Sequence, residues 1–170
     1  RGSTLRDLIL GLQSQGVNVS LSDNLGAERT TAAFAFTQDT PENVLETMAL
    51  AAGWQVTEKE GIHYIAPAKR NPQKEVHELR QQMNPEKTPH VNLNSVGQRV
   101  TLRDGCEAFK RDADLDYLIM DIRLADWPLP EAGLTDTPLP TVMNLLQDRG
   151  VPMEWALKNS TLIMVPAVRK

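Results

Sequence analysis

A helix-start motif occurs twice in the chain and constrains its architecture more than any other feature. Thr4-Leu5-Arg6-Asp7 recurs as Thr101-Leu102-Arg103-Asp104, and a threonine followed three positions later by an acidic residue is typical of a capped helix N-terminus. Farther along, Asp39-Thr40-Pro41 recurs as Asp136-Thr137-Pro138, and 97 positions separate the members of both pairs. Because two distant motifs share one offset, the sequence predicts two copies of one small folding unit.

The first copy alternates between helical and strand periodicity. Apolar residues at helical spacing predict a helix that begins at Thr4, and Thr40-Pro41 predicts the start of a second helix. Alternating apolar and polar residues predict four strands, two between the helices and two after them, so that the order is α-β-β-α-β-β. These strands are expected at residues 17–21, 31–37, 54–57 and 63–66.

A proline-rich connector separates the copies. Within it, residues 73–83 predict one short helix with a thin apolar stripe, which we expect to lie on one of the two units. Val91 and Leu93 predict a strand in front of the second copy. The first copy should have an equivalent leading strand, which we expect to be missing or truncated. Its neighbouring strand would then have an unpaired edge, which favours pairing between chains.

These patterns predict an α+β fold made of two tandem βαββαβ-type small domains, each with two helices packed on small sheets. The first domain is expected at residues 1–68, a linker with a short helix at 69–90, and the second domain at 91–170. A chain of 170 residues with 41% hydrophobic residues is large enough for two small cores.

The second copy departs from the first at residues 127–134. Two prolines exclude a central strand there, so an edge strand or an irregular loop is expected. One interpretation is that Trp127, Pro128, Leu129 and Pro130 form a rigid docking surface for a partner. The alternative is that Trp127 folds back over the helices, since large aromatic side chains are mostly buried. The exposure of Trp127 distinguishes the two.

The composition limits the classes of partner and of chemistry. The formal charge of −4 and the pI near 5.4 argue against a general nucleic-acid binder. No stretch approaches the roughly 18 consecutive apolar residues of a membrane helix. The one cysteine, Cys106, excludes a disulfide framework within the chain and a cysteine-based zinc site. It occupies the position of Ile9 in the first copy, which predicts a small buried hydrophobic side chain.

The remaining polar residues lack the spacing of known sites. No histidine has a second ligand at metal spacing, and the acidic run at 112–121 lacks the glycine and the terminal glutamate of a calcium loop. The sequence also has no phosphate-binding loop and no nucleophile elbow. We therefore expect no enzymatic activity, no cofactor and no metal site. The residues concerned are His63, His77, His90, Asp112, Asp114, Asp116 and Asp121.

Together, the motifs of both copies resemble the short N-terminal domain shared by secretins and TonB-dependent receptors, the STN domain. The resemblance covers most of residues 1–68 and, less well, 91–168. It departs from the family pattern at 127–134, where the third strand is interrupted. The matching residues are Leu5–Ile9, Thr40–Leu45, Gly53-Trp54 and Ile62–Ile65 in the first copy, and Leu102–Asp104, Thr137–Val142, Gly150-Val151 and Leu162–Pro166 in the second.

This resemblance implies a non-enzymatic protein–protein interaction module in the periplasm, part of a larger cell-envelope protein. Tandem copies favour a secretin-like secretion or assembly component over a signalling receptor of the outer membrane. The expected partners are other envelope proteins, with self-association through exposed sheet edges. No nucleic acid is expected, and a membrane is expected only through parts of the protein outside this sequence. The alternative is a small-molecule or glycan-binding module that uses a groove between the two domains.

Overall fold

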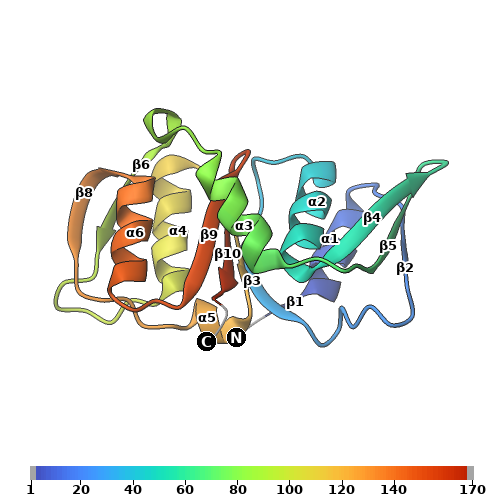
Figure 1. Ribbon diagram of the computed structural model, residues 1–170, viewed down its shortest axis with the longest axis horizontal. Coiled ribbons are helices and arrows are strands. Elements are labelled where there is room, and N and C mark those ends of the chain that lie inside the picture. Colours follow the sequence, from blue (N-terminus) through green and yellow to red (C-terminus); the bar gives the residue numbers. More distant parts are fainter. Residues whose placement is uncertain (1–2, 168–170) are drawn as a thin grey trace.

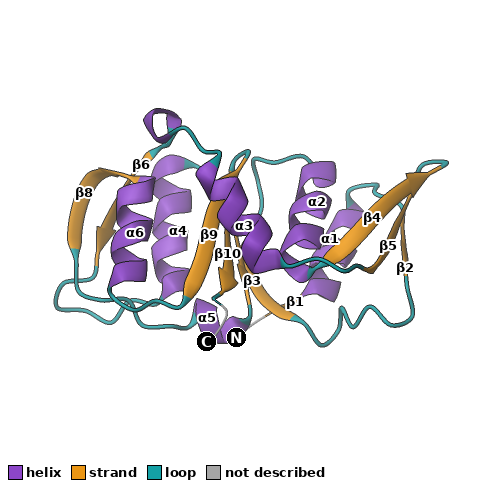
Figure 2. Cartoon of the chain, in the orientation of Figure 1, coloured by secondary structure: helices purple, strands orange, loops and turns teal. Residues whose placement is uncertain are grey.

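Helices and strands alternate along the chain, and the predicted α+β class is confirmed (Figure 1, Figure 2). The structure is a computed structural model that describes residues 3–167. Within this range, no helix has the length and apolar character needed to cross a membrane. The helices are α1 (Leu5–Ser14), α2 (Pro41–Ala52), α3 (Pro72–Gln81), the 3-10 helix η1 (Pro85–Lys87), α4 (Leu102–Ala113), α5 (Ile122–Ala125) and α6 (Leu139–Asp148). The strands are β1 (Ser3–Thr4), β2 (Val19–Leu21), β3 (Thr31–Ala35), β4 (Trp54–Lys59), β5 (Ile62–Pro67), β6 (His90–Asn94), β7 (Asp116–Met120), β8 (Gly133–Pro138), β9 (Met153–Lys158) and β10 (Thr161–Pro166).

Both copies of the helix-start motif begin a helix, as predicted. The backbone N–H of Asp7 donates to Thr4 Oγ1 at 3.4 Å, and the N–H of Thr4 donates to Asp7 Oδ2 at 3.0 Å. The corresponding distances between Asp104 and Thr101 are 3.2 and 3.0 Å. Each motif thus satisfies backbone donors that the helix itself leaves unpaired.

Strand pairing in the first half of the chain recurs in the second half. β5 pairs parallel with β2 and antiparallel with β4, and β10 pairs in the same way with β7 and β9. The antiparallel contact of β1 with β3 also has a counterpart, the bridge between Thr101 and Pro128. β1 corresponds to residues 100–101 and not to β6, so it is not the leading strand expected for the first copy; Arg1 and Gly2 lie outside the described residues. The division into residues 1–68, 69–90 and 91–170 stays a prediction.

One sheet is common to both halves, which the sequence did not predict. β3 of the first half pairs antiparallel with β7 of the second half, and the resulting sheet has the order β1-β3-β7-β10-β9. It lies between α1 and α2 on one face and α4 and α6 on the other (Figure 1). Neighbouring residues point into opposite cores: Leu118 and Ile163 face α1 and α2, while Ile119 and Met164 face α4 and α6. Because both faces are buried, β7 and β10 have continuous apolar runs instead of an alternating pattern.

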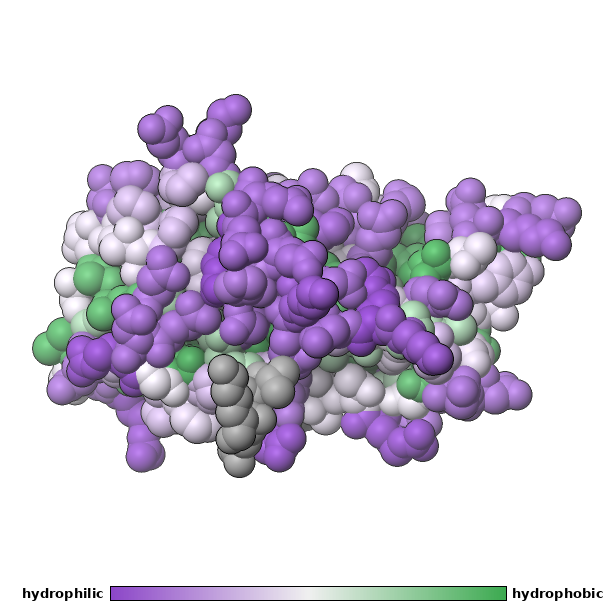
Figure 3. Space-filling view, in the orientation of Figure 1, coloured by the Kyte–Doolittle hydropathy of each residue, from purple (hydrophilic) through white to green (hydrophobic). Residues whose placement is uncertain are grey.

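Helix α3 bridges the two halves, and the expectation that it would lie on one unit is wrong. It contacts α2 in the first half and both β9 and β10 in the second. Its apolar stripe buries Val76, and Arg80 lies over the ring of Trp155 at 5.4 Å and 3.3 Å from Glu154. The shared sheet brings β9 beside α2, so the connector helix packs on both. Its outward face is hydrophilic (Figure 3).

The start of α6 also differs from the prediction. Thr40 caps α2 through its hydroxyl, as predicted, but the equivalent Thr137 lies in β8, paired with Val91. α6 begins at Leu139 after Pro138, without a side-chain cap. Pairing with β6 keeps Thr137 extended, and this tertiary contact overrides the local capping signal.

A buried carboxylate joins the end of β3 to the second half. Asp116, fully buried at the start of β7, accepts hydrogen bonds from the backbone N–H groups of Thr37, Gln38 and Asp39 at 2.9, 2.8 and 3.0 Å. Lys110 Nζ lies 3.1 Å from the same carboxylate. Successive N–H groups that converge on one anion form a backbone nest. Because these residues are held in the nest, β3 ends at Ala35, two residues before its predicted end.

The environment of Asp116 lowers the pKa of its carboxyl group. Burial alone would raise this pKa, but the hydrogen bonds from Asp39, Thr37, Gln38 and Lys110 outweigh burial and favour the charged form. The folded-state pKa therefore lies below the unfolded-state value of about 3.9. The contribution of the Asp116 carboxylate to the stability of the fold is therefore fully present above the unfolded-state pKa. It is lost as the pH falls through the folded-state pKa.

We predict that Asp116→Asn lowers the free energy of unfolding by about 3 kcal/mol, because three backbone donors and Lys110 lose their anion. The variant should also lose part of the destabilisation that the protein shows below about pH 4. Urea unfolding followed by circular dichroism at pH 7 and at pH 3 measures both effects. Asp112→Asn, at a surface position paired only with Arg111, is the control and should change stability by less than about 0.5 kcal/mol. Equal effects of the two variants would contradict the assigned role of Asp116.

The two equivalent threonines should differ in their contribution to stability. Thr40→Ala removes a helix cap and should cost about 1 kcal/mol. Thr137→Ala removes no cap and should cost less than about 0.5 kcal/mol. Thermal unfolding of the two variants side by side tests this contrast, and a larger loss at Thr137 would show that α6 is capped as the sequence suggested.

Candidate partner-binding surface

The predicted docking segment begins directly after the short helix α5. Asp121 precedes this helix with a positive φ of 74°, and its carboxylate accepts a hydrogen bond from Arg123 N at 2.9 Å. At the other end of the helix, the N–H of Trp127 donates to Leu124 O at 3.1 Å. The helix and its caps therefore fix where the chain leaves the sheet and which way Trp127 faces.

Backbone hydrogen bonds hold the segment against the start of α4. Leu102 N donates to Trp127 O at 3.0 Å, and Leu129 N donates to Val100 O at 2.8 Å. The Leu129 side chain packs on the core that α4 and α6 form with the shared sheet. It lies so close to Gly105 that a Cβ atom on this glycine would be 3.2 Å from Leu129 Cδ1. As expected from its prolines, residues 127–132 form no central strand, and the edge strand β8 begins only at Gly133.

Trp127 is the exposed aromatic residue of the segment. Its side chain is 37% exposed, whereas Trp54 and Trp155 are 5% and 1% exposed. It borders a hollow of 280 Å³ whose other apolar walls come from α5 and the ends of β9 and β10. Of the two interpretations, this exposure favours the docking surface over a side chain folded back on the helices. The lining residues are Asp121, Arg123, Leu124, Trp127, Pro152, Pro166 and Ala167.

The structure separates the four predicted residues into two pairs. Trp127 and Pro128 lie on the surface, while Leu129 and Pro130 are half-buried. Pro130 O accepts a hydrogen bond from Ser95 Oγ at 2.6 Å. The second pair thus anchors the segment, and the first pair is available for contact.

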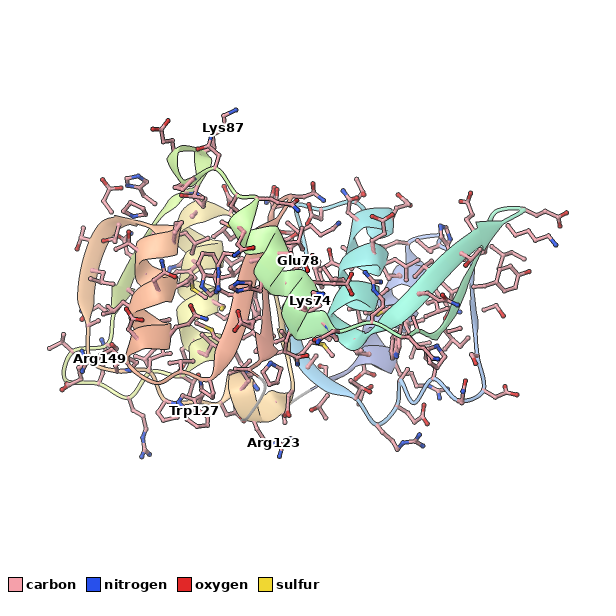
Figure 4. The ribbon with its side chains drawn as sticks, viewed as in Figure 1. Lys74, Glu78, Lys87, Arg123, Trp127 and Arg149 are labelled. Carbon is pink, nitrogen blue, oxygen red and sulfur yellow. The ribbon has the colours of Figure 1, made fainter. Side chains whose placement is uncertain are left out.

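A charged rim adjoins the hollow. Arg123 Nη2 lies 2.7 Å from Asp121 Oδ2, and its side chain is 87% exposed (Figure 4). The hydrogen bonds from Arg123 hold the pKa of Asp121 below its usual value. A second hollow of 500 Å³ shares Asp121, Arg123 and Pro166 with the first and extends to Arg29. An apolar floor beside exposed guanidinium groups is typical of protein-binding surfaces.

A further groove of 450 Å³ lies between α2, β4 and α3, and Lys158 of the second half also lines it. Its floor is apolar, and four of its five charged side chains form two ion pairs; Glu78 is the fifth. Arg70 Nη2 lies 2.7 Å from Glu75 Oε1, and Lys158 Nζ lies 3.7 Å from Glu46 Oε2. A charged ligand in this groove would compete with these two ion pairs.

The histidines lie on different elements, β5, α3 and β6. His63 lies 3.5 Å from Glu58, His77 lies 3.4 Å from Glu154, and His90 lies 3.2 Å from Asp136. Within residues 3–167, no group of three or more histidine, cysteine or acidic side chains is arranged to hold a metal ion.

The acidic run is likewise divided among separate structural roles. Asp114 ends α4 in the left-handed conformation, and Asp121 caps α5. Asp116 is the residue whose importance the sequence did not reveal. Its only sequence signal was a carboxylate at the start of an apolar strand.

Cys106 is buried in the second core, as predicted, with its Sγ 3.7 Å from Met164 Sδ. Burial raises the pKa of this thiol far above its usual value, so the thiolate is disfavoured. Ile9, its equivalent in the first copy, is also buried. This position therefore serves packing in both halves.

Comparisons with protein-family models, with curated proteins and with solved structures returned no match. The candidate surface therefore rests on its own geometry.

The exposure of Trp127 makes a spectroscopic prediction. Trp127→Phe should remove most of the tryptophan fluorescence that acrylamide quenches, because the other two tryptophans are buried. Trp54→Phe, at a buried position, should leave the quenchable fraction nearly unchanged. Steady-state quenching of the two variants and the unsubstituted protein decides the matter, and strong quenching in Trp127→Phe would contradict the described packing.

Proposed function

We propose that this chain is a non-enzymatic protein–protein interaction module of the periplasm and part of a larger envelope protein, either a secretin-like secretion or assembly component or an envelope signalling protein. The resemblance of both copies to STN domains supports this setting. The observation that carries the proposal is the exposed Trp127 beside an apolar hollow and a guanidinium rim. Binding surfaces are enriched in tryptophan and arginine for this combination of apolar area and hydrogen-bonding capacity.

Rigidity of the segment further supports a docking role. Trp127 is bonded through both its N–H and its carbonyl, and a proline follows it. A side chain that is already positioned loses little conformational entropy when a partner binds. The binding energy of the aromatic ring is then available for affinity.

A small-molecule or glycan-binding module remains the second candidate. The groove between α2, β4 and α3 favours it, since residues of both halves line this groove. Its paired charges weigh against it, because a ligand would have to displace two ion pairs. The Trp127 hollow has one ion pair, Asp121 with Arg123, whose Arg123 side chain is 87% exposed, so fewer paired charges stand in the way of a partner there.

The proposal predicts a partner contact at Trp127. A photo-crosslinking amino acid at position 127, in the protein expressed in the cells that encode it, should capture a specific envelope protein. The same amino acid at Leu10, which is 50% exposed on α1, is the matched control and should not capture that protein. Cell fractionation checks the periplasmic location.

The captured partner allows a quantitative measurement. Trp127→Ala should weaken its binding about 30-fold, as expected for the loss of about 2 kcal/mol at a binding hot spot. Leu10→Ala should change the affinity less than about twofold. Equal capture at both positions, or unchanged affinity of Trp127→Ala, would refute the proposed surface.

A further inference from the structure

The two halves have equivalent strands, so the strand pairing that joins them within one chain defines how two chains could pair. Thr4 bridges Thr31, with Leu5 N donating to Thr30 O at 2.9 Å. At an offset of 97, Thr101 bridges Pro128, with Leu102 N donating to Trp127 O at 3.0 Å. The segment 128–132 is therefore the equivalent of β3. We call its outward-facing backbone the donor edge.

The equivalent of β7 in the first half is β2. The hairpins define the register: Trp54 pairs with Pro67, and Met153 pairs with Pro166, at an offset of 99. In β2, Ser20 lies beside Tyr64 of β5, and the equivalent pair in the second half is Leu118 of β7 beside Ile163 of β10. The edge of β2 that does not pair with β5 corresponds to the edge of β7 that binds β3. We call it the acceptor edge.

Repeating the internal junction would place the donor edge of one copy on the acceptor edge of the next. Such a contact is heterologous, since it joins two different surfaces, and it would propagate into rings or filaments. Strand edges with free N–H and C=O groups favour this kind of association. Such an association requires that the two edges keep the features that join β3 to β7.

The donor edge has lost its hydrogen-bond donors. Pro128 stands where β3 has Thr31, and Pro130 stands where β3 has Ala33, which lies opposite Ile119 in the ladder. Proline has no N–H to donate to a neighbouring strand. Farther along, the N–H of Ala132 donates to Ser95 Oγ at 2.9 Å, within the same half. This edge therefore cannot reproduce the pairing of β3 with β7.

The acceptor edge has lost the aliphatic pair of the internal junction. Leu118 and Ile163 are fully buried under the helices of the first half, whereas the equivalent Ser20 and Tyr64 are exposed. In repeat proteins, a polar outer face on a terminal unit ends the array. Helices of a further unit would meet the hydroxyl groups of Ser20 and Tyr64 where the internal junction has two aliphatic side chains.

The acceptor edge also lacks the anion that holds the incoming strand. Asp116 precedes Tyr117 as Asn18 precedes Val19, so Asn18 is its equivalent. Asn18 is exposed, and a neutral amide cannot hold a nest of N–H groups as a carboxylate does.

We infer that the chain is a two-unit array in which both edges that could extend it are blocked, the donor edge by Pro128 and Pro130 and the acceptor edge by Asn18, Ser20 and Tyr64. The protein is then expected to be a monomer, whereas the sequence predicted self-association through sheet edges. This expectation holds whichever partner binds at Trp127.

Two complementary variants test the inference. A donor variant, Pro128→Thr with Pro130→Ala and Ser95→Ala, restores the missing N–H groups of the donor edge and removes the Ser95 hydroxyl that binds Ala132 N and Pro130 O. An acceptor variant carries Asn18→Asp, Ser20→Leu and Tyr64→Ile, which restore the features of β7 and β10. Circular dichroism establishes that each variant is folded. In analytical ultracentrifugation, each variant alone should sediment as a monomer, and an equimolar mixture should form a 1:1 complex.

A single proline provides the matched control. Asn18 O accepts from His63 N at 2.8 Å and Ser22 N donates to Ile65 O at 2.9 Å, so both residues direct these backbone groups toward β5. Because alternate residues of a strand bond to opposite sides, the N–H and C=O of Leu21 point to the free side of β2. Leu21→Pro in the acceptor variant should therefore abolish the complex. A mixture of folded variants that stays monomeric would overturn the inference.

The unsubstituted protein gives an independent test if a variant does not fold. It should remain monomeric as its concentration is raised, with or without Leu21→Pro. Concentration-dependent association of the unsubstituted protein that Leu21→Pro removes would show that the acceptor edge is open, and would also overturn the inference.

Discussion

The pairing of β3 with β7 is the interaction on which the rest of the structure depends. It places a strand of the first half in a sheet of the second half, so that helices from both halves bury the two faces of one layer. Asp116 holds the end of β3 through three backbone N–H groups and so connects the sheet to the start of α2. Helix α3 then packs over both halves, because the shared sheet brings α2 and β9 together.

This arrangement gives each half a different environment although their strand pairings agree. β7 and β10 have apolar residues on both faces, while β2 and β5 have one exposed face. The two halves also differ at the segment after α5, where Pro128 and Pro130 stand in place of Thr31 and Ala33 of β3. These prolines lack the N–H groups that a further strand would need, and Trp127 directly before them is exposed at the surface.

The surface around Trp127 has features that suit recognition of a partner. Its polar groups are ion-paired or hydrogen-bonded, as Asp121 with Arg123 illustrates, and its apolar walls are held by backbone contacts. Because an interaction module needs a defined shape more than a reactive group, these features are consistent with the proposed periplasmic role.

Local sequence signals determined a large part of this fold. The helix starts at Thr4, Thr40 and Thr101, the burial of Cys106 and the irregular segment at Pro128 and Pro130 follow from capping, periodicity and the missing N–H of proline. These effects act within a few residues of the chain, so they can be read from the sequence alone.

Only the tertiary structure decided how the two copies meet. No local pattern specifies which strand edge β3 joins, since backbone hydrogen bonds carry no sequence information about the partner strand. The same limit explains the late start of α6, where pairing of Thr137 with Val91 outweighs a capping signal. It also explains why the role of Asp116 was not predicted from the sequence: its partners, Thr37 to Asp39, lie about eighty residues away. The sequence thus determined the two units, and long-range pairing determined their junction and the surface that remains exposed.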